Sequence, residues 1–262
     1  MIIGISGKKQ AGKDTACNFI SSYRLLTKGI LEEFKIDKEG KVQVCENGNE
    51  IGEYDIRALQ EFNEQVAWQF ARVFSFADEL KCLCINYFGL TFDQCYGDNE
   101  NKNSLTKIMW KNMPYATKKG KKGFMTAREL LQVFGTKVMR KIYDPVWSEM
   151  CIKNIRDHLE SVGHPGQCLC LVSDVRFPNE VEAIQKTGGK VIRLTRDVHP
   201  EDTSDSEHAL DEDKFDWDKF DCVLDNSESS ISDQNGLLYK KLVEWAVFQD
   251  EVEEKGKITT AL

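Results

Sequence analysis

A glycine-rich turn close to the N-terminus constrains the fold of this chain more than any other feature. Residues 7–13 read Gly-Lys-Lys-Gln-Ala-Gly-Lys, which is the pattern G-x-x-x-x-G-K. The apolar run Ile2–Ser6 before it predicts a buried strand, and Lys13–Tyr23 after it predicts a helix. Between a strand and a helix, such glycines let successive N–H groups converge on one phosphate, and the helix dipole adds positive potential. The turn therefore predicts a phosphate-binding loop in an α/β protein.

The two residues that follow this loop differ from the usual motif. Asp14 stands where a Ser or Thr normally ligates Mg²⁺, and Thr15 comes next. Asp14 is suited either to holding Mg²⁺ through water or to capping the helix, and a plain glycine turn with a capping Asp is the structural alternative. The candidate nucleotide-binding residues of the loop are Gly7, Lys9, Gln10, Gly12, Lys13, Asp14 and Thr15.

Five short apolar runs predict the strands of one sheet. Helical stretches separate them and both faces of each run are apolar, which is typical of a parallel sheet covered by helices. The expected fold class is therefore α/β, in three layers, with a five-stranded parallel sheet and helices on both faces. The runs are Ile2–Ser6, Arg72–Phe76, Cys168–Ser173, Lys190–Thr195 and Phe220–Asp225.

A carboxylate ends the third of these runs. In nucleotide-binding α/β proteins, an aspartate in the position of Asp174 lies beside the phosphate loop and faces Mg²⁺ or its waters. No Glu stands next to it to activate water, and the planar guanidinium of Arg176 is suited to gripping phosphoryl oxygens. The pair favours transfer to a bound acceptor over hydrolysis, while an ion pair between Arg176 and Glu180 is the structural alternative. The candidate metal ligands are Asp14, Thr15 and Asp174.

A second group of candidate residues follows the capping box Thr126-Ala-Arg-Glu129, which predicts the start of a helix. Arg128 and Gln132 share one face of that helix, where they are suited to reading a base and a phosphate. Gly135-Thr136 is expected to break or pinch the helix. The alternatives are an ordinary amphipathic helix with solvated arginines and, for Trp147, a place in the core instead of stacking on a base. The candidate substrate-binding residues here are Arg128, Gln132, Gly135, Thr136, Arg140 and Trp147.

The length of 262 residues is consistent with one domain over residues 1–262, and two segments look added to it. Residues 27–57 contain the turn Asp37–Gly40 between short extended pieces, which predicts an inserted surface hairpin. Residues 197–218 hold ten Asp or Glu and one Lys, and form either a solvated loop or a lid-like loop over an active site. Arg196, at the base of this loop, is suited to stabilising charge on a transferring phosphate, or equally to a surface position.

Composition and charge exclude several classes of protein. No run of about 18 apolar residues is present, which argues against a membrane protein. The net charge of −8 argues against a general nucleic-acid binder. The first residues carry no secretory signal, so we expect a cytoplasmic protein, in the host cytoplasm if it is viral. A homodimer is left open.

Assembled in this order, these residues resemble the bacteriophage-type deoxynucleoside monophosphate kinases, which are P-loop nucleotide kinases. A phosphate loop with Asp after the Lys is characteristic of that family. Phosphomevalonate kinases share a similar loop and a similar Ser-Asp-x-Arg block, but the segment RELLQVFGT at 128–136 favours the nucleotide enzyme. The matching blocks keep their order over nearly the whole chain and lie at residues 5–15, 74–81, 96–102, 127–147, 171–180, 191–196 and 221–226.

The resemblance implies a P-loop kinase fold and the transfer of the γ-phosphoryl of ATP, with Mg²⁺, to a deoxynucleoside 5′-monophosphate, giving the diphosphate. ATP would lie over Gly7–Thr15, and Lys13, Arg176 and Arg196 would be catalytic. A kinase for another small phosphomonoester and a non-catalytic nucleotide sensor are the alternative functions. The monophosphate would lie against Lys9, Lys81, Lys102, Arg128, Gly135, Thr136, Trp147, Asp174, Arg176 and Glu180.

Overall fold

A computed structural model describes residues 1–46, 49–54, 67–113, 121–202 and 204–249 of the chain. Contacts between residues divide it into two compact units. The first unit comprises the described residues of Met1–Ser75 and Asn154–Leu262, and the second comprises those of Phe76–Lys153. The single kinase domain over 1–262 stays a prediction.

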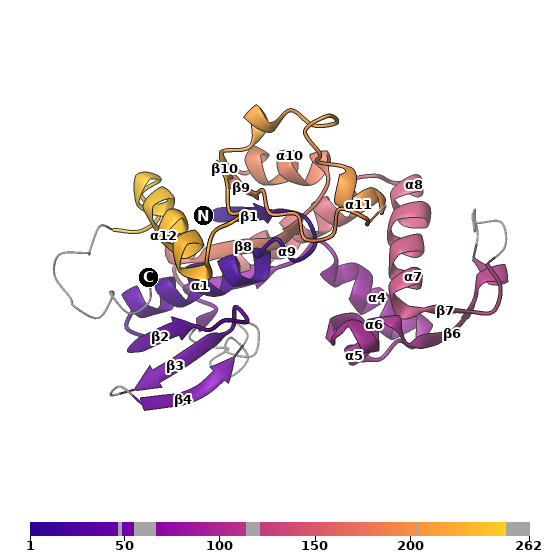
Figure 1. The fold of residues 1–262 in the computed structure, drawn as a ribbon, viewed down its shortest axis with the longest axis horizontal. Helices are drawn as coiled ribbons and strands as arrows, with labels where there is room; N and C mark the ends of the chain where they lie inside the picture. Colours follow the sequence, from indigo (N-terminus) through magenta and orange to yellow (C-terminus); the bar gives the residue numbers. More distant parts are fainter. Residues whose placement is uncertain (47–48, 55–66, 114–120, 203, 250–262) are drawn as a thin grey trace. The chain divides into compact units, whose positions relative to one another are not determined.

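The central sheet of the first unit is parallel, with the strand order β10-β9-β1-β8-β5 (Figure 1). Gly4 of β1 pairs with Val172 of β8 on one side and with Val191 of β9 on the other. The carboxyl ends of these three neighbouring strands therefore meet at one edge of the sheet. The predicted five-stranded parallel sheet is confirmed. Its strands are β1 (Ile2–Ser6), β5 (Ala71–Phe74), β8 (Leu169–Val175), β9 (Lys190–Leu194) and β10 (Cys222–Leu224).

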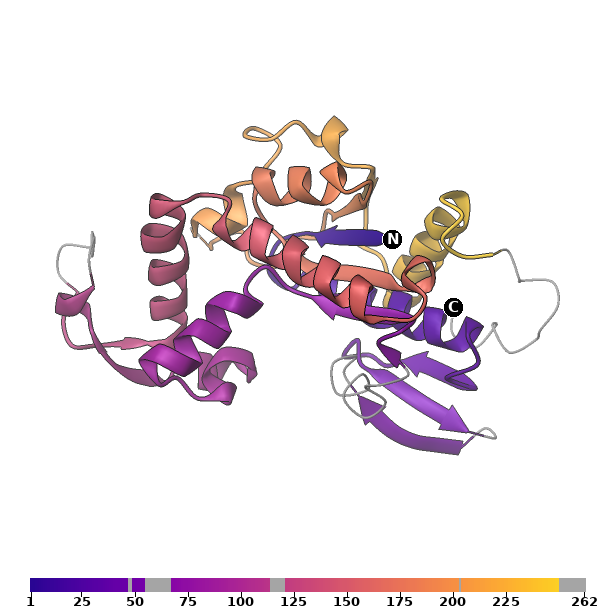
Figure 2. The same ribbon diagram turned by 180° about the vertical axis from the view of Figure 1, so that it is seen from behind.

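Helices cover both faces of the sheet, as predicted. On one face, α1 (Lys13–Thr27) packs against the strands and α12 (Ile231–Glu244) packs against α1. On the opposite face lie α10 (Pro178–Lys186), which packs on β1 and β9, and the last turns of α9 (Val146–Ser161), seen in front of the strands in Figure 2. No helix among the described residues combines the length and the apolar character that a membrane span requires.

Strand β1 is buried on both faces, because α1 and α10 cover the two sides of the sheet there. The side chains of Ile3 and Ile5 are fully buried in the core under α1. At Gly4, a Cβ atom would lie only 2.5 Å from Cδ1 of Ile184 in α10. The absence of a side chain at this position thus allows α10 to approach the strand.

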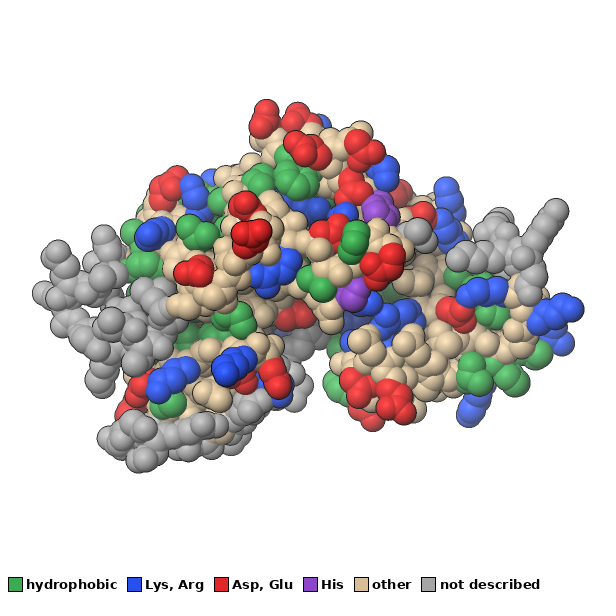
Figure 3. Space-filling view, in the orientation of Figure 1, with side chains coloured by type: hydrophobic (Ala, Val, Ile, Leu, Met, Phe, Trp, Pro, Cys, Tyr) green, Lys and Arg blue, Asp and Glu red, His purple; other side chains and the backbone are tan. Residues whose placement is uncertain are grey.

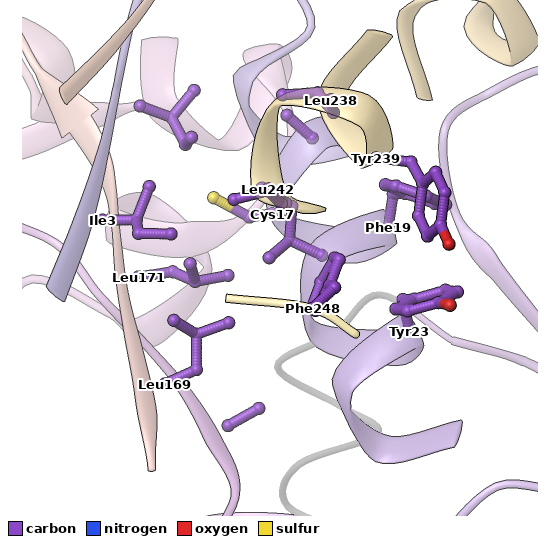
Figure 4. Packing of buried hydrophobic residues seen from close by; sticks show 14 of the residues in the cluster. Ile3, Cys17, Phe19, Tyr23, Leu169, Leu171, Leu238, Tyr239, Leu242 and Phe248 are labelled. Atoms are coloured by element: carbon purple, nitrogen blue, oxygen red, sulfur yellow. The ribbon is translucent and has the colours of Figure 1, made fainter. Parts of the chain in front are cut away.

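Aromatic rings fill the core between α1 and α12 (Figure 4). Phe19 and Tyr23 of α1, Tyr239 of α12 and Phe248 are buried there. The ring centroids of Tyr23 and Phe248 are 4.5 Å apart, and those of Tyr23 and Tyr239 are 5.3 Å apart. This packing anchors α1, and with it the position of the glycine-rich turn at its N-terminus.

The segment predicted to be an insertion contains a small antiparallel sheet of β2 (Glu33–Ile36), β3 (Val42–Glu46) and β4 (Asn49–Tyr54). The predicted hairpin is present between β2 and β3, and Nδ2 of Asn18 in α1 donates a hydrogen bond to the carbonyl of Gly40 in its turn (2.6 Å). Phe34 is buried in the core, so the hairpin packs on α1. Residues 47–48 and 55–57 of the predicted insertion lie outside the described residues.

The second unit consists mostly of helices. The predicted capping box is confirmed, because the side chains of Thr126 and Glu129 exchange hydrogen bonds with each other's backbone N–H. The helix is not broken at Gly135 but continues as the π-helical segment Val133–Met139. A Cβ on Gly135 would lie 2.5 Å from Leu80 of α4. The elements are α4 (Asp78–Phe88), α5 (Phe92–Tyr96), α6 (Asn99–Asn103), β6 (Leu105–Met109), β7 (Phe124–Thr126), α7 (Ala127–Gln132) and α8 (Arg140–Ile142).

We predict that Gly4→Val destabilises the protein by about 1–3 kcal/mol, because the new side chain would collide with Ile184 and Val175 in a packed core. Gly163→Val is the matched control, since a Cβ there meets no atom within 4 Å. Urea unfolding followed by circular dichroism measures both variants. Equal losses of stability in the two would contradict the close approach of α10 to β1.

Candidate active site

The glycine-rich turn lies between the end of β1 and the start of α1, as predicted. Its backbone is curled, with positive φ angles at Gln10 (59°) and Gly12 (94°). Glycine tolerates that conformation at Gly12 without steric cost, and it has no side chain with which to cap α1. The first N–H groups of α1 therefore donate no hydrogen bond to an N-cap side chain, as expected for a helix start that binds an anion.

Two buried amide side chains hold this curled backbone from a distant part of the sequence. Nδ2 of Asn226, which follows β10, donates hydrogen bonds to the carbonyl of Ala11 (2.8 Å) and to Oε1 of Gln234 (2.6 Å). Nε2 of Gln234 in α12 donates in turn to the carbonyl of Gly12 (3.4 Å). Sequence reasoning assigned no role to either residue, although Asn226 follows a predicted strand and ends the matching block 221–226.

Lys13 folds back over the loop that precedes it. Its Nζ donates to the carbonyl oxygens of Gly7 (2.8 Å) and Lys8 (2.5 Å), and the residue is 7% exposed. Burial, followed by the positive charge of Arg176, lowers the pKa of Lys13 to about 7, although Asp14 and Asp174 act in the opposite direction. The ammonium is thus held in a place where burial makes its positive charge costly.

The end of β8 supplies the carboxylate that the sequence predicted. Asp174 accepts a hydrogen bond from Oγ of Ser75 (2.5 Å) and lies close enough to Lys13 to affect its pKa. Asp14 is exposed at the start of α1. The hydroxyl of Thr15 lies against Gly40 in the hairpin turn, where a Cβ on that glycine would collide with Oγ1 of Thr15. The structure therefore brings Asp174 to the loop but turns the Thr15 hydroxyl toward Gly40.

Arg176 and the loop backbone bind the same carboxylate. The buried side chain of Glu207, in the short helix α11 (Asp205–His208), forms an ion pair with Nη1 of Arg176 through Oε1. Its other oxygen, Oε2, accepts a hydrogen bond from the backbone N–H of Lys9 (2.6 Å). The Arg176 guanidinium and a loop amide therefore point at one anion position. No sequence signal distinguished Glu207 from its acidic neighbours.

Glu180 has a structural role in α10. Its Oε2 accepts hydrogen bonds from the backbone N–H groups of Arg176 (2.7 Å) and Phe177 (3.0 Å), which caps the first turn of the helix. The cap fixes the backbone that carries Arg176. The side chain of Arg176 is itself paired with Glu207, so the ion pair to Glu180 considered from the sequence is replaced by these backbone contacts.

Side chains of the acidic segment, residues 197–218, contact the phosphate loop at further points. Nζ of Lys8 lies 2.7 Å from Asp197 and 3.4 Å from Asp211, and the side chains of His199 and Gln10 are in hydrogen-bond contact at 2.5 Å. Acidic side chains gather over this segment, at the top of the view in Figure 3. A cavity of about 570 Å³ beside it is lined by Lys8, Arg193, Thr195, Asp197, Asp211, Glu212, Asp213 and Trp217.

The two arginines at the end of β9 differ in their surroundings. Arg193 is buried, its Nη1 donates to Oγ of Ser6 (3.1 Å), and its positive charge contributes to lowering the Lys13 pKa. The guanidinium of Arg196 instead donates to the carbonyls of Asn226 (3.0 Å) and Ser229. Arg193 is thus the arginine at the loop, and Arg196, the candidate catalytic residue, is tied to the segment after β10.

The remaining candidate residues belong to the second unit. Lys81 of α4 lies over the ring of Tyr96 (4.3 Å from Nζ to the centroid), and Nη2 of Arg128 donates to Oδ1 of Asn99 (2.8 Å). Lys102 lies in α6, Gln132 ends α7, and Thr136 lies in the π-helical segment.

Two further candidates are buried in this unit. Trp147 is 6% exposed and its Nε1 donates to the carbonyl of Gly135 (3.1 Å), so the indole bridges α9 and the π-helical segment. Arg140 is buried and lies 3.6 Å from Asp144. These contacts correspond to the structural alternative for Trp147, and its role in substrate binding stays a prediction.

Comparison with known proteins decides the family. The family model described as deoxynucleotide monophosphate kinase matches residues 1–235. This chain belongs to that family. It is also 30% identical, over 162 residues, to an Acanthamoeba polyphaga mimivirus protein named "Putative deoxynucleotide monophosphate kinase", and the match covers 59% of this chain and 75% of the relative.

The kinase function predicted from the sequence is thereby confirmed. A deoxynucleotide monophosphate kinase is a phosphotransferase that acts on a small-molecule nucleotide, and neither a kinase for another phosphomonoester nor a non-catalytic sensor matches that description. Within the first unit, the kinase brings Lys9, Lys13, Asp174 and Arg176 to one edge of its sheet. The assignment of individual residues to substrate, metal or catalysis stays a prediction.

We predict that the binding of ATP at about pH 8 takes up most of one proton from the buffer. At that pH Lys13 is largely neutral in the free protein, because its pKa is about 7, and phosphate charges would raise its pKa again. Calorimetry in buffers of different ionisation enthalpy measures the uptake. Lys13→Arg should abolish it, since arginine stays charged, whereas Lys8→Arg should not. Undiminished uptake by Lys13→Arg would contradict the assignment.

Proposed function

We propose that the phosphate chain of ATP binds over residues 7–15, and that its γ-phosphoryl passes to a deoxynucleoside 5′-monophosphate held partly by Arg176. One observation supports this most directly. The N–H of Lys9 and the guanidinium of Arg176 already share a single carboxylate, that of Glu207. Groups that converge on a carboxylate in this way are suited to converge on a phosphoryl group, which offers more oxygens and more charge.

The acceptor needs no strong general base, because its phosphate is ionised before it reacts. The protein therefore acts by positioning two phosphate groups and by neutralising the charge that develops between them. Curled loop amides and Lys13 would hold the transferring phosphoryl, and Arg176 would draw the acceptor phosphate toward it. Buried donors of this kind need little reorganisation during the reaction.

Two carboxylates, one at the end of β8 and one at the start of α1, fit a Mg²⁺ ion. Mg²⁺ prefers oxygen ligands and keeps several waters, and the carboxylates of Asp174 and Asp14 offer such oxygens near Lys13. Because the Thr15 hydroxyl lies against Gly40, Thr15 is a weaker candidate ligand for Mg²⁺ than the two aspartates. When bound, the ion would neutralise phosphate charge, and Asp174 and Asp14 would hold it directly or through water.

Recognition of the deoxynucleoside belongs, in this proposal, to the second unit. Arg128 and Gln132 follow each other on one face of α7, and Lys81, Lys102 and Arg140 supply further positive charge. Thr136 offers a hydroxyl and Gly135 a close approach of backbone. Arg196 would contribute only if its contacts to Asn226 and Ser229 were exchanged for substrate, so it is the weakest of the three catalytic candidates.

The partner of this chain is then a free nucleotide and not a nucleic acid, in line with its net charge of −8. A cytoplasmic location, the host cytoplasm for a viral protein, follows from the use of free deoxynucleotides. A homodimer stays a prediction.

We predict that Lys13→Met and Arg176→Ala each lower turnover by several orders of magnitude while both variants keep the wild-type circular-dichroism spectrum. Both remove charge that faces the reacting phosphates, as in other phosphoryl-transfer sites. Lys186→Met and Arg156→Ala, which alter exposed residues, are the matched controls. Turnover is measured as ADP release. Wild-type turnover in Arg176→Ala would show that this residue does not hold the acceptor.

We predict acceptor-dependent ADP release with at least one of the four deoxynucleoside monophosphates and none with phosphomevalonate. The panel is run with ATP and Mg²⁺ on the wild-type protein. Turnover with phosphomevalonate, and none with the deoxynucleotides, would overturn the proposed acceptor class.

A further inference from the structure

Glu207 differs from the other carboxylates of the acidic segment in what it touches. Its side chain is 8% exposed, whereas Glu212 and Asp213 in the same segment are exposed. One oxygen is bound to a backbone N–H of the phosphate loop and the other to Arg176. A buried carboxylate is stable only when its charge and lone pairs are satisfied, and here both partners are groups that the proposed reaction needs.

The positive charges around this carboxylate explain why it is held there. Lys13, Arg176 and Arg193 lie close enough together for the two arginines to lower the pKa of Lys13. Three cations placed close to one another repel unless an anion lies among them. Glu207 supplies an anion to Arg176, while Asp14 and Asp174 supply negative charge near Lys13. A carboxylate offers two oxygens and one charge, so it reproduces part of what a phosphoryl group would offer to the same donors.

The same geometry prevents Glu207 and a phosphate from being bound together. The N–H of Lys9 has a single hydrogen, and Oε2 accepts it at 2.6 Å. A phosphoryl oxygen bonded to that N–H would have to take the place of Oε2. Two anions at one position would also repel each other strongly in a buried site.

We propose that Glu207 is an internal phosphate mimic, which occupies the phosphate position formed by the Lys9 N–H and Arg176 and is displaced when a nucleotide binds. The inference rests on the proposed function, since it assumes that phosphate uses these donors. Glu207 therefore sets the affinity of the kinase for its phosphate-bearing ligands. Part of the binding free energy is used to release the carboxylate, so the apparent affinity is lower than the intrinsic one.

Displacement also reaches the rest of the acidic segment. The loop residues Lys8 and Gln10 contact Asp197, Asp211 and His199. The neighbouring Lys9 contacts Glu207, so Glu207 is linked to those side chains through the loop. A ligand that takes the place of the carboxylate removes its attachment to the phosphate loop. Nucleotide binding is in this way coupled to the position of α11.

The test is a comparison of ligand affinities in Glu207→Gln and wild type by isothermal titration calorimetry. ATP with Mg²⁺ and inorganic tripolyphosphate are the two probes. Removing the charge that competes with phosphate should tighten both affinities on the order of tenfold, as expected for the loss of a charge-assisted contact. Glu212→Gln makes the same change of net charge in the same segment without contact to Lys9 or Arg176, and should bind as wild type does.

The outcomes separate the inference from the proposed function. Equal or weaker binding by Glu207→Gln overturns the inference, and so does equal tightening in Glu212→Gln, which would indicate general repulsion. Absence of ATP binding by both wild type and Glu207→Gln would instead contradict the proposed function. If Glu207→Gln melts at a much lower temperature, Glu207→Asp is tested instead. Its shorter side chain should no longer reach the Lys9 N–H and Arg176 together, so we expect the same tightening of both ligand affinities.

Discussion

The convergence of positive groups on one anion position is the constraint on which the rest of this site depends. Lys13 and Arg193 are buried and Arg176 lies beside them, an arrangement whose electrostatic cost is high without a compensating anion. In the free protein the Glu207 carboxylate pairs with Arg176, and the loop carbonyls together with the charges of Asp14 and Asp174 stabilise Lys13. Affinity for phosphate and burial of cations are thus two consequences of one arrangement.

A rigid frame is needed to keep like charges close together. The sheet provides it, because β1 is buried on both faces and ends directly at the loop. Aromatic packing of α1 against α12 holds the helix that begins at Lys13. Asn226 and Gln234 then fix the loop carbonyls from the far end of the chain. Small displacements in any of these elements would alter the distances on which catalysis by positioning depends.

The glycine-rich loop, the strands and the helix cap could be predicted from the sequence, because the signals for them are local. A G-x-x-x-x-G-K turn between an apolar run and a helix specifies its own conformation, and an apolar run that ends in Asp174 specifies a strand end. The capping box at Thr126 was equally local. The continuation of the helix through Gly135 was not expected from the local sequence, in which a glycine is a poor helix former, and the close approach of Leu80 to Gly135 comes from another helix.

The sequence by itself determined the sheet and the glycine-rich loop, predicted roles for Asp174 and Arg176, and showed the resemblance to the kinase family. Only the tertiary structure decided which of ten acidic residues in one segment binds a backbone N–H of the loop, and that Asn226 and Gln234 support the loop. It also decided that Arg193, and not Arg196, lies with Lys13. The physical reason is range. Strands, turns and caps arise from neighbours in the chain, whereas a buried charge is placed by partners about 200 residues away, whose contact follows from sheet order and packing.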